Sequence, residues 1–371
     1  MKQLFSILVA IAMVNNISVS FAQNLVSPQV HEDGSVTFRL RAPKAQQVDV
    51  TVGGQKLALA KSGNGIWEGS SKPLSPQIYD YTFNVDGTMM IDPSNRMVKK
   101  WLTMASMVEI PGNPPLITEV QKVPHGEIHR ISYPSSVSPA DRTAMVYTPP
   151  GYASSEGRVY PLLILMHGYG DDETAWTEVG RAHAIADNLI ATSQIEPVVI
   201  VMPYGHPEPL NLQERPDNYF IRNNELYERD VTECLLPFLE ARYRIETNAD
   251  RRAIAGLSMG GGHAIDIGLK NPQMFSSVAA FSAAVPQKND QDLLAEYPSL
   301  GGTPPAANSF KSFWIPIGKD DFLLKGNEAF DAQLTKLGVV HQYELTDGGH
   351  DWKVWRDYLP KFLTMAFPKE K

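Results

Sequence analysis

The stretch that decides the fold of this chain is Arg252-Ala253-Ile254-Ala255-Gly256-Leu257-Ser258-Met259-Gly260-Gly261-Gly262. Its first half is an apolar run that predicts a buried strand, and the residues that follow Gly260 open a helical pattern. The two glycines that flank Ser258 at a distance of two residues leave room for a sharp turn, in which larger side chains would collide. A strand, a sharp turn and a helix together raise the serine hydroxyl to the end of a sheet, as a nucleophilic serine requires.

The five-residue motif is weak evidence without this context. Glycine and serine each make up about 7% of residues, so about one chain in eight of this length contains such a motif by chance. A glycine-rich turn that binds a phosphate is the alternative interpretation of the stretch. The strand before the motif and the helix after it favour the nucleophile.

A serine hydroxyl needs a base to remove its proton, and the base needs an acid to orient it. In the fold that this turn is typical of, the chain order is serine, then Asp or Glu, then histidine. Three histidines follow Ser258. His263 lies too near on the outgoing helix and His341 begins the last strand pattern, whereas His350 follows that strand behind two glycines. We therefore predict His350 as the base.

The acid is expected after the preceding buried strand, residues 313–317, which ends at Gly318-Lys319-Asp320-Asp321. Spacing alone barely separates Asp320 from Asp321, and either could instead be a helix cap or a solvated charge. The two N–H donors that stabilise an oxyanion are expected at Met259, directly after the serine, and in the loop after the apolar run 163–166. In that loop we favour Tyr169 over Gly168.

Aromatic residues near these loops are candidates for substrate binding, namely Trp176, Trp352 and Trp355. Trp352 and Trp355 are three residues apart and would share one helix face. Each of the three is more often a core residue than a substrate platform, and both possibilities stay open at this point.

Working outward, continuous apolar runs alternate with amphipathic segments from about residue 126 to the end, which predicts a mostly parallel central sheet flanked by helices, the α/β-hydrolase fold class. Residues 23–110 instead show short strands of period two separated by turn formers, which predicts a small immunoglobulin-like β-sandwich. Residues 111–125 are expected to be a proline-rich linker. The domains are therefore 1–22, 23–110, 111–125 and 126–371, the first being a signal peptide.

The signal peptide is predicted from Lys2, the short apolar run 4–14 and the small residues of a cleavage site at 20–22. The run is too short to span a bilayer, so we expect an exported protein, periplasmic or secreted, without membrane insertion. The 371 residues carry a formal net charge of −8 and one cysteine. No basic run suits nucleic acid, no internal disulfide is possible, and no cluster has metal-ligand spacing, so we expect no metal and no cofactor.

With these motifs placed, residues 127–368 resemble the esterase D-like family and, more closely, the feruloyl esterases of carbohydrate esterase family one. The resemblance rests on residues 180–191, on Arg252 to Gly262 and on Gly348-Gly349-His350-Asp351-Trp352 with Val354-Trp355. It implies Ser258 and His350 as nucleophile and base. The family's Gly-x-x-Asp pattern, matched by residues 318–321, implies Asp321 as the acid.

The N-terminal part resembles the early-set sandwiches related to family 48 carbohydrate-binding modules, on residues 36–43, Gly65-Ile66-Trp67, Tyr79-Asp80-Tyr81 and Asp92-Pro93. Because Tyr79, Tyr81 and Phe83 share one strand face, we expect them in the core, and the sandwich to support the esterase rather than to bind polysaccharide.

The expected function is hydrolysis of ester side groups of plant xylan, with feruloylated or acetylated xylan and arabinoxylan oligosaccharides as partners. Feruloyl esters are the leading substrate. An acetyl xylan esterase, a non-catalytic carbohydrate-binding protein and an acyltransferase are the alternatives.

Overall fold

The computed structural model describes residues 25–369, and the predicted signal peptide, residues 1–22, lies outside the described residues. Within residues 25–369 no helix is long and apolar enough to cross a membrane.

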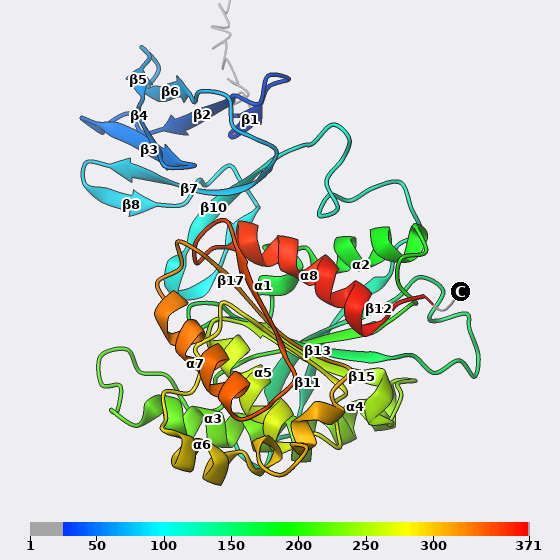
Figure 1. Ribbon diagram of the computed structural model, residues 1–371. Helices are drawn as coiled ribbons and strands as arrows, with labels where there is room; N and C mark the ends of the chain where they lie inside the picture. Colours follow the sequence, from blue (N-terminus) through cyan, green and yellow to red (C-terminus); the bar gives the residue numbers. More distant parts are fainter. Residues whose placement is uncertain (1–24, 370–371) are drawn as a thin grey trace, which may run out of the picture.

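The N-terminal region consists of two facing β-sheets, drawn in blue to cyan in Figure 1. One sheet has the order β1-β2-β6-β5, and the other has the order β4-β3-β7-β10-β9, with β8 paired to β7. Apolar side chains from both sheets form one core, which includes Phe38, Val50, Trp67, Tyr81 and Phe83. Tyr81 and Phe83 are therefore core residues, as predicted, whereas Tyr79 is only partly buried at its margin. The strands are β1 (Gln29–Val30), β2 (Val36–Arg41), β3 (Val48–Val52), β4 (Gln55–Ala58), β5 (Ala60–Lys61), β6 (Ile66–Ser70), β7 (Gln77–Val85), β8 (Thr88–Met90), β9 (Val98–Lys99) and β10 (Ala105–Ile110).

The second region is built on one eight-stranded sheet of order β11-β12-β14-β13-β15-β16-β17-β18. The pairs from β14 through β18 are parallel, whereas β11 with β12 and β12 with β14 are antiparallel. The central strands are buried along their whole length, as their continuous apolar sequence requires. The strands are β11 (Glu127–Tyr133), β12 (Arg142–Thr148), β13 (Leu162–Met166), β14 (Val199–Pro203), β15 (Arg252–Leu257), β16 (Ser277–Phe281), β17 (Ser312–Gly318) and β18 (Gln342–Thr346).

Helices cover both faces of this sheet (Figure 1). One face packs against α3 to α7, and the other against α1, α2 and α8. The helices are α1 (Ala175–Glu178), α2 (Ala182–Ala191), α3 (Tyr219–Arg229), α4 (Leu236–Arg242), α5 (Met259–Lys270), α6 (Asp290–Glu296), α7 (Leu324–Lys336) and α8 (Trp352–Ala366), with a π-helical turn η2 (Asp230–Leu235) and 3-10 turns η1 (Trp101–Thr103), η3 (Ala249–Arg251), η4 (Pro298–Leu300) and η5 (Ala306–Ser309). The prediction of an α/β region preceded by a β-rich region is confirmed.

The sandwich packs directly on the helical face that holds α8. Ile78 of β7 and Met107 of β10 belong to the same apolar cluster as the residues of α2 and α8. The buried Arg356 of α8 donates to the Ile78 carbonyl at 3.3 Å, and Arg181 pairs with Glu109 at 3.2 Å. The two regions are therefore held in a fixed contact beside the carboxyl ends of the central strands.

Candidate active site

Ser258 lies in the turn between β15 and α5, with φ 53° and ψ −116°. A left-handed φ is strained for serine, and such strain persists only where the surrounding structure holds the residue in place. A Cβ at Gly256 would lie 2.3 Å from the Gly260 carbonyl oxygen, and one at Gly260 would lie 2.5 Å from the His167 carbonyl oxygen. The turn therefore requires both glycines and places the Ser258 hydroxyl at the carboxyl end of β15.

The structure brings Ser258, His350 and Asp321 into one hydrogen-bonded series. Ser258 Oγ lies 2.9 Å from His350 Nε2, and His350 Nδ1 lies 2.9 Å from Oδ2 and 3.1 Å from Oδ1 of Asp321. When Nδ1–H donates to the carboxylate, Nε2 keeps its lone pair and accepts the serine proton. The geometry is that of a nucleophile, a base and an orienting acid.

Two loops from distant parts of the sequence bring the acid and the histidine together. Gly318 ends β17, and a Cβ there would lie only 2.2 Å from the Gly348 carbonyl oxygen, so glycine permits the close approach. The Asp320 N–H donates to the same Gly348 carbonyl at 2.9 Å. The Asp320 side chain is exposed to solvent, whereas that of Asp321 is buried against His350.

The charge of Asp321 is stabilised by its neighbours. Burial alone would raise the pKa of this carboxyl, but the hydrogen bonds from His350 and from the Leu323 N–H outweigh burial, and the pKa is lowered. The Leu323 N–H donates to Asp321 Oδ1 at 2.8 Å. Asp321 is therefore ionised at neutral pH and available to hold the imidazole.

The residues predicted to supply oxyanion donors lie on either side of Ser258. Met259 is the first residue of α5, where the unpaired N–H groups and the helix dipole favour negative charge. Tyr169 follows Gly168, whose Cα approaches the serine so closely that a Cβ there would lie 3.4 Å from the Ser258 Cβ. Both Gly168 and Tyr169 line the pocket that contains Ser258.

Of the three predicted substrate-binding tryptophans, Trp352 and Trp355 line this pocket, and Trp355 meets the His350 ring edge to face at 5.0 Å. Trp176 is fully buried, donates to the Met166 carbonyl at 2.9 Å and packs against Trp352. Trp176 therefore lies behind the wall of the pocket and is a core residue, which is one of the two possibilities that the sequence left open.

The pocket has a volume of about 550 Å³, and part of its lining could not be predicted from the sequence. Asp80 of β7, Lys99 of β9 and Leu102 and Thr103 of η1 come from the N-terminal region, more than 150 residues before Ser258. Nothing local in the sequence points to these residues, because only the packing of the sandwich against α8 brings them to the serine. Phe322, which is 76% exposed, packs against the His350 ring with a centroid distance of 4.4 Å and a tilt of 51°.

Charged groups also line the same pocket. Lys99 lies 3.8 Å from Asp80 and 4.0 Å from Asp171. Burial raises the pKa of Asp171 to about 6 even though Lys99 opposes the shift. Among the described residues, no group of three or more His, Cys, Asp or Glu side chains is arranged to hold a metal ion.

Comparison with known proteins now adds to this geometry. Residues 135–365 match the family described as Putative esterase. An endo-1,4-beta-xylanase/feruloyl esterase of Xylanibacter ruminicola is 33% identical over 256 residues, which are 67% of this chain but only 35% of that protein. The chain thus spans about a third of the length of that relative.

Two solved structures have folds similar to that of this chain. A ferulic acid esterase superposes with a TM-score of 0.57 at 27% identity, over 66% of this chain and 98% of the other. The enterobactin esterase of Shigella flexneri superposes with a TM-score of 0.63 at 22% identity, over 90% of this chain and 92% of the other, and it shows similarity of fold alone. The chain belongs to the Putative esterase family, and hence to the carboxylic ester hydrolases.

Proposed function

We propose that the chain is a serine esterase in which Ser258 attacks the ester carbonyl, His350 accepts and returns the proton, and Asp321 orients the imidazole. The observation that carries this proposal is the hydrogen-bonded series from Ser258 Oγ to His350 Nε2, and from His350 Nδ1 to Asp321, at the wall of an open pocket. Membership of an esterase family supports the same assignment.

The reaction proceeds through an acyl-enzyme. As Ser258 Oγ bonds to the carbonyl carbon, its proton moves to His350 Nε2, and the negative charge that develops on the carbonyl oxygen is stabilised by the N–H groups of Met259 and Tyr169. Collapse of the tetrahedral intermediate expels the alcohol, which takes the proton from His350. A water molecule then attacks the acyl-enzyme carbonyl while His350 removes its proton. When the second tetrahedral intermediate collapses, His350 returns the proton to Ser258 Oγ and the carboxylic acid is released.

The substrate that we propose is a feruloyl ester carried by plant xylan. The relative from Xylanibacter ruminicola and the superposed ferulic acid esterase support this acyl group by their names. Aromatic and aliphatic side chains from Leu102, Phe322 and Trp355 surround the serine, and the volume of about 550 Å³ accommodates an aromatic acyl group. An acetyl xylan esterase uses the same machinery and is the alternative.

We further propose that the N-terminal sandwich completes the pocket rather than serving as an independent polysaccharide-binding module. Its contribution of Asp80, Lys99 and Leu102 to the lining supports that role. Export to the periplasm or the medium, directed by residues 1–22, belongs to the same proposal, since polymeric xylan does not enter cells.

The experiment that tests the substrate is a comparison of kcat/KM for methyl ferulate, methyl caffeate, acetylated xylan and 4-nitrophenyl acetate. The proposal predicts that kcat/KM is higher for methyl ferulate than for 4-nitrophenyl acetate, even though methyl ferulate has the poorer leaving group. A preference for acetylated xylan over both hydroxycinnamoyl esters would favour the alternative.

A further inference from the structure

His167 is a buried histidine that the mechanism above does not use. It follows β13, is 1% exposed, and both of its ring nitrogens are engaged with backbone groups. Nδ1 lies 2.8 Å from the Gly168 carbonyl oxygen, and Nε2 lies 2.8 Å from the Gly205 nitrogen. Because a backbone N–H can only donate, Nε2 is the acceptor and the proton of the neutral ring is on Nδ1. Burial lowers the pKa of His167 to about 4, so the ring is neutral near pH 7.

The shorter of two hydrogen bonds to the Gly168 carbonyl comes from His167 at 2.8 Å, the other coming from the Asp171 N–H at 3.2 Å, and together they fix the direction of the next N–H. In a trans peptide the C=O and the following N–H point in opposite directions. With the Gly168 carbonyl turned toward His167, the Tyr169 N–H is turned away from it. Gly168 and Tyr169 line the pocket together with Ser258, so an N–H turned away from the buried His167 is available to the pocket.

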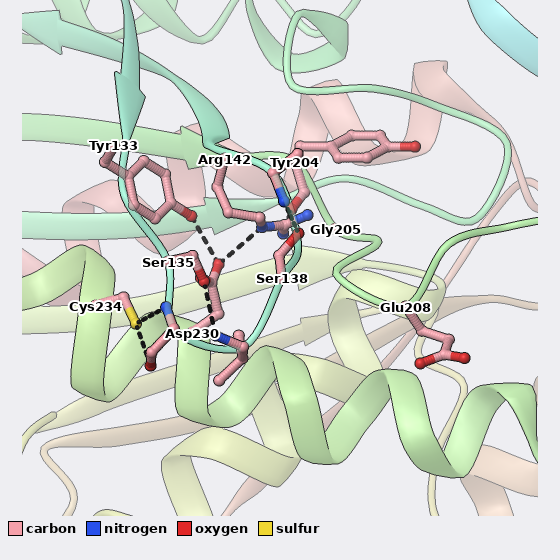
Figure 2. Close-up of polar contacts among 12 residues, drawn as sticks. Tyr133, Ser135, Ser138, Arg142, Tyr204, Gly205, Glu208, Asp230 and Cys234 are labelled. Carbon is pink, nitrogen blue, oxygen red and sulfur yellow. Dashed lines mark hydrogen bonds and ion pairs between the residues drawn. The ribbon is translucent and has the colours of Figure 1, made fainter.

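The peptide that donates to His167 is held between two hydrogen bonds in the same way. The peptide between Tyr204 and Gly205 directs its N–H to His167 Nε2, and its carbonyl, that of Tyr204, accepts from Arg142 Nη2. Figure 2 shows Arg142 between this backbone and Asp230. Arg142 Nε donates to Asp230 at 3.1 Å, and Asp230 also accepts from the hydroxyls of Tyr133 at 2.7 Å and Ser135 at 2.6 Å. Arg142 and Asp230 are 4% and 0% exposed, so the start of the series is fixed in the core.

Every donor in this series points the same way. Arg142 donates to the Tyr204 carbonyl, the Gly205 N–H to His167, and His167 to the Gly168 carbonyl. Aligned hydrogen bonds polarise one another, and a cation at the start makes the last N–H a better donor. We propose that His167 is a positioning residue, which aims and polarises the Tyr169 N–H toward the oxyanion through a hydrogen-bond series that begins at the Arg142–Asp230 pair.

This inference rests on the proposed serine mechanism, and His167 variants test it. An Asn side chain can place an amide N–H where Nδ1 donates, whereas Gln reaches the Nε2 position, and Leu replaces neither. We expect His167→Leu to lower kcat about 30- to 300-fold with KM changed less than threefold, since loss of one oxyanion donor lowers kcat by about 10² to 10³. His167→Asn should recover at least tenfold of that loss, and His167→Gln should recover less.

A second measurement separates positioning from simple structural support. A trifluoromethyl ketone forms a tetrahedral adduct with the serine, so its affinity should fall in parallel with kcat, whereas inhibition by the free product acid should not change. His341→Leu is the control, because the His341 side chain is only 5% exposed and lies 2.9 Å from a backbone carbonyl through Nδ1, with Nε2 2.8 Å from Asp331, but directly before the edge strand β18. This control variant should have a lower thermal stability, whereas its kcat and its affinities for the trifluoromethyl ketone and for the product acid should be unchanged.

The outcomes distinguish this inference from the proposed function. Wild-type protein without esterase activity would refute the serine mechanism itself. With an active wild type, a His167→Leu variant within threefold of its kcat, or equal losses of kcat and product affinity, would overturn the positioning role. Should the Leu variant not fold, the comparison of Asn with Gln decides, and activity of Gln equal to or above that of Asn refutes the proposal.

Discussion

Replacement of Asp321 by asparagine should disable the proposed catalysis by reversing the proton on His350. In the wild type, Oδ1 of Asp321 accepts from the Leu323 N–H at 2.8 Å, and Oδ2 accepts from His350 Nδ1 at 2.9 Å. An asparagine must direct its oxygen to Leu323, because an N–H cannot face another N–H. Its amide group then donates to Nδ1, and the ring proton moves to Nε2, where it faces Ser258 and blocks removal of the hydroxyl proton.

The magnitude follows from the loss of the correct tautomer together with the ionised partner. Wrong-tautomer variants of triads of this kind lose about 10⁴ in kcat, which corresponds to about 5.5 kcal/mol in the activation free energy. The matched control is Asp320→Asn, since that side chain is one residue away and exposed. The assay is kcat for methyl ferulate at pH 7, with circular dichroism to show that both variants fold. Comparable losses in the two variants, or more than a tenth of wild-type turnover in Asp321→Asn, would refute the reasoning.

Three further predictions follow from the same geometry. Gly260→Ala should lower the free energy of unfolding by about 3 kcal/mol or more, because its Cβ would lie 2.5 Å from the His167 carbonyl oxygen. The control Gly63→Ala has open space at its Cβ position and should change the free energy of unfolding by less than about 1 kcal/mol. Urea denaturation measures both values. Asp171→Asn should raise the free energy of unfolding by up to about 3 kcal/mol at pH 8 and leave it nearly unchanged at pH 4. The reason is that a carboxyl whose pKa rises to about 6 on folding destabilises the protein progressively as the pH rises from 4 to 6. Urea denaturation at both pH values checks the sign of the effect. Leu102→Ala should lower kcat/KM for methyl ferulate about tenfold, or about 1.4 kcal/mol, and lower it less for 4-nitrophenyl acetate, since the larger acyl group contacts more of the wall; equal losses with both esters would contradict this placement.

The sequence was most informative where local pattern and chemistry coincide. The turn around Ser258 could be predicted because strand, glycine spacing and helix all lie within eleven residues. His350 followed from chain order and from the two glycines before it. The choice between Asp320 and Asp321 could not be made from spacing, because it depends on which carboxyl faces the imidazole. That is set by the contact of the Gly318 and Gly348 backbones.

Other parts of the site depend on contacts between distant segments. The pocket wall at Lys99 and Leu102 exists because β7 and β10 pack against α8, and no local pattern encodes this contact. The three tryptophans could not be sorted by sequence for the same reason. Trp176 packs against Phe281 and Trp352, so its burial depends on residues more than 100 positions further along the chain.

The central claim, that Ser258 forms a covalent acyl-enzyme, is tested most directly by labelling with a fluorophosphonate. Intact-protein and peptide mass spectrometry should show one adduct, on the peptide that contains Ser258, with activity lost in proportion to labelling. The Ser258→Ala variant should remain unlabelled. An adduct on another residue with Ser258 unmodified, or full esterase activity in completely labelled protein, would contradict the account.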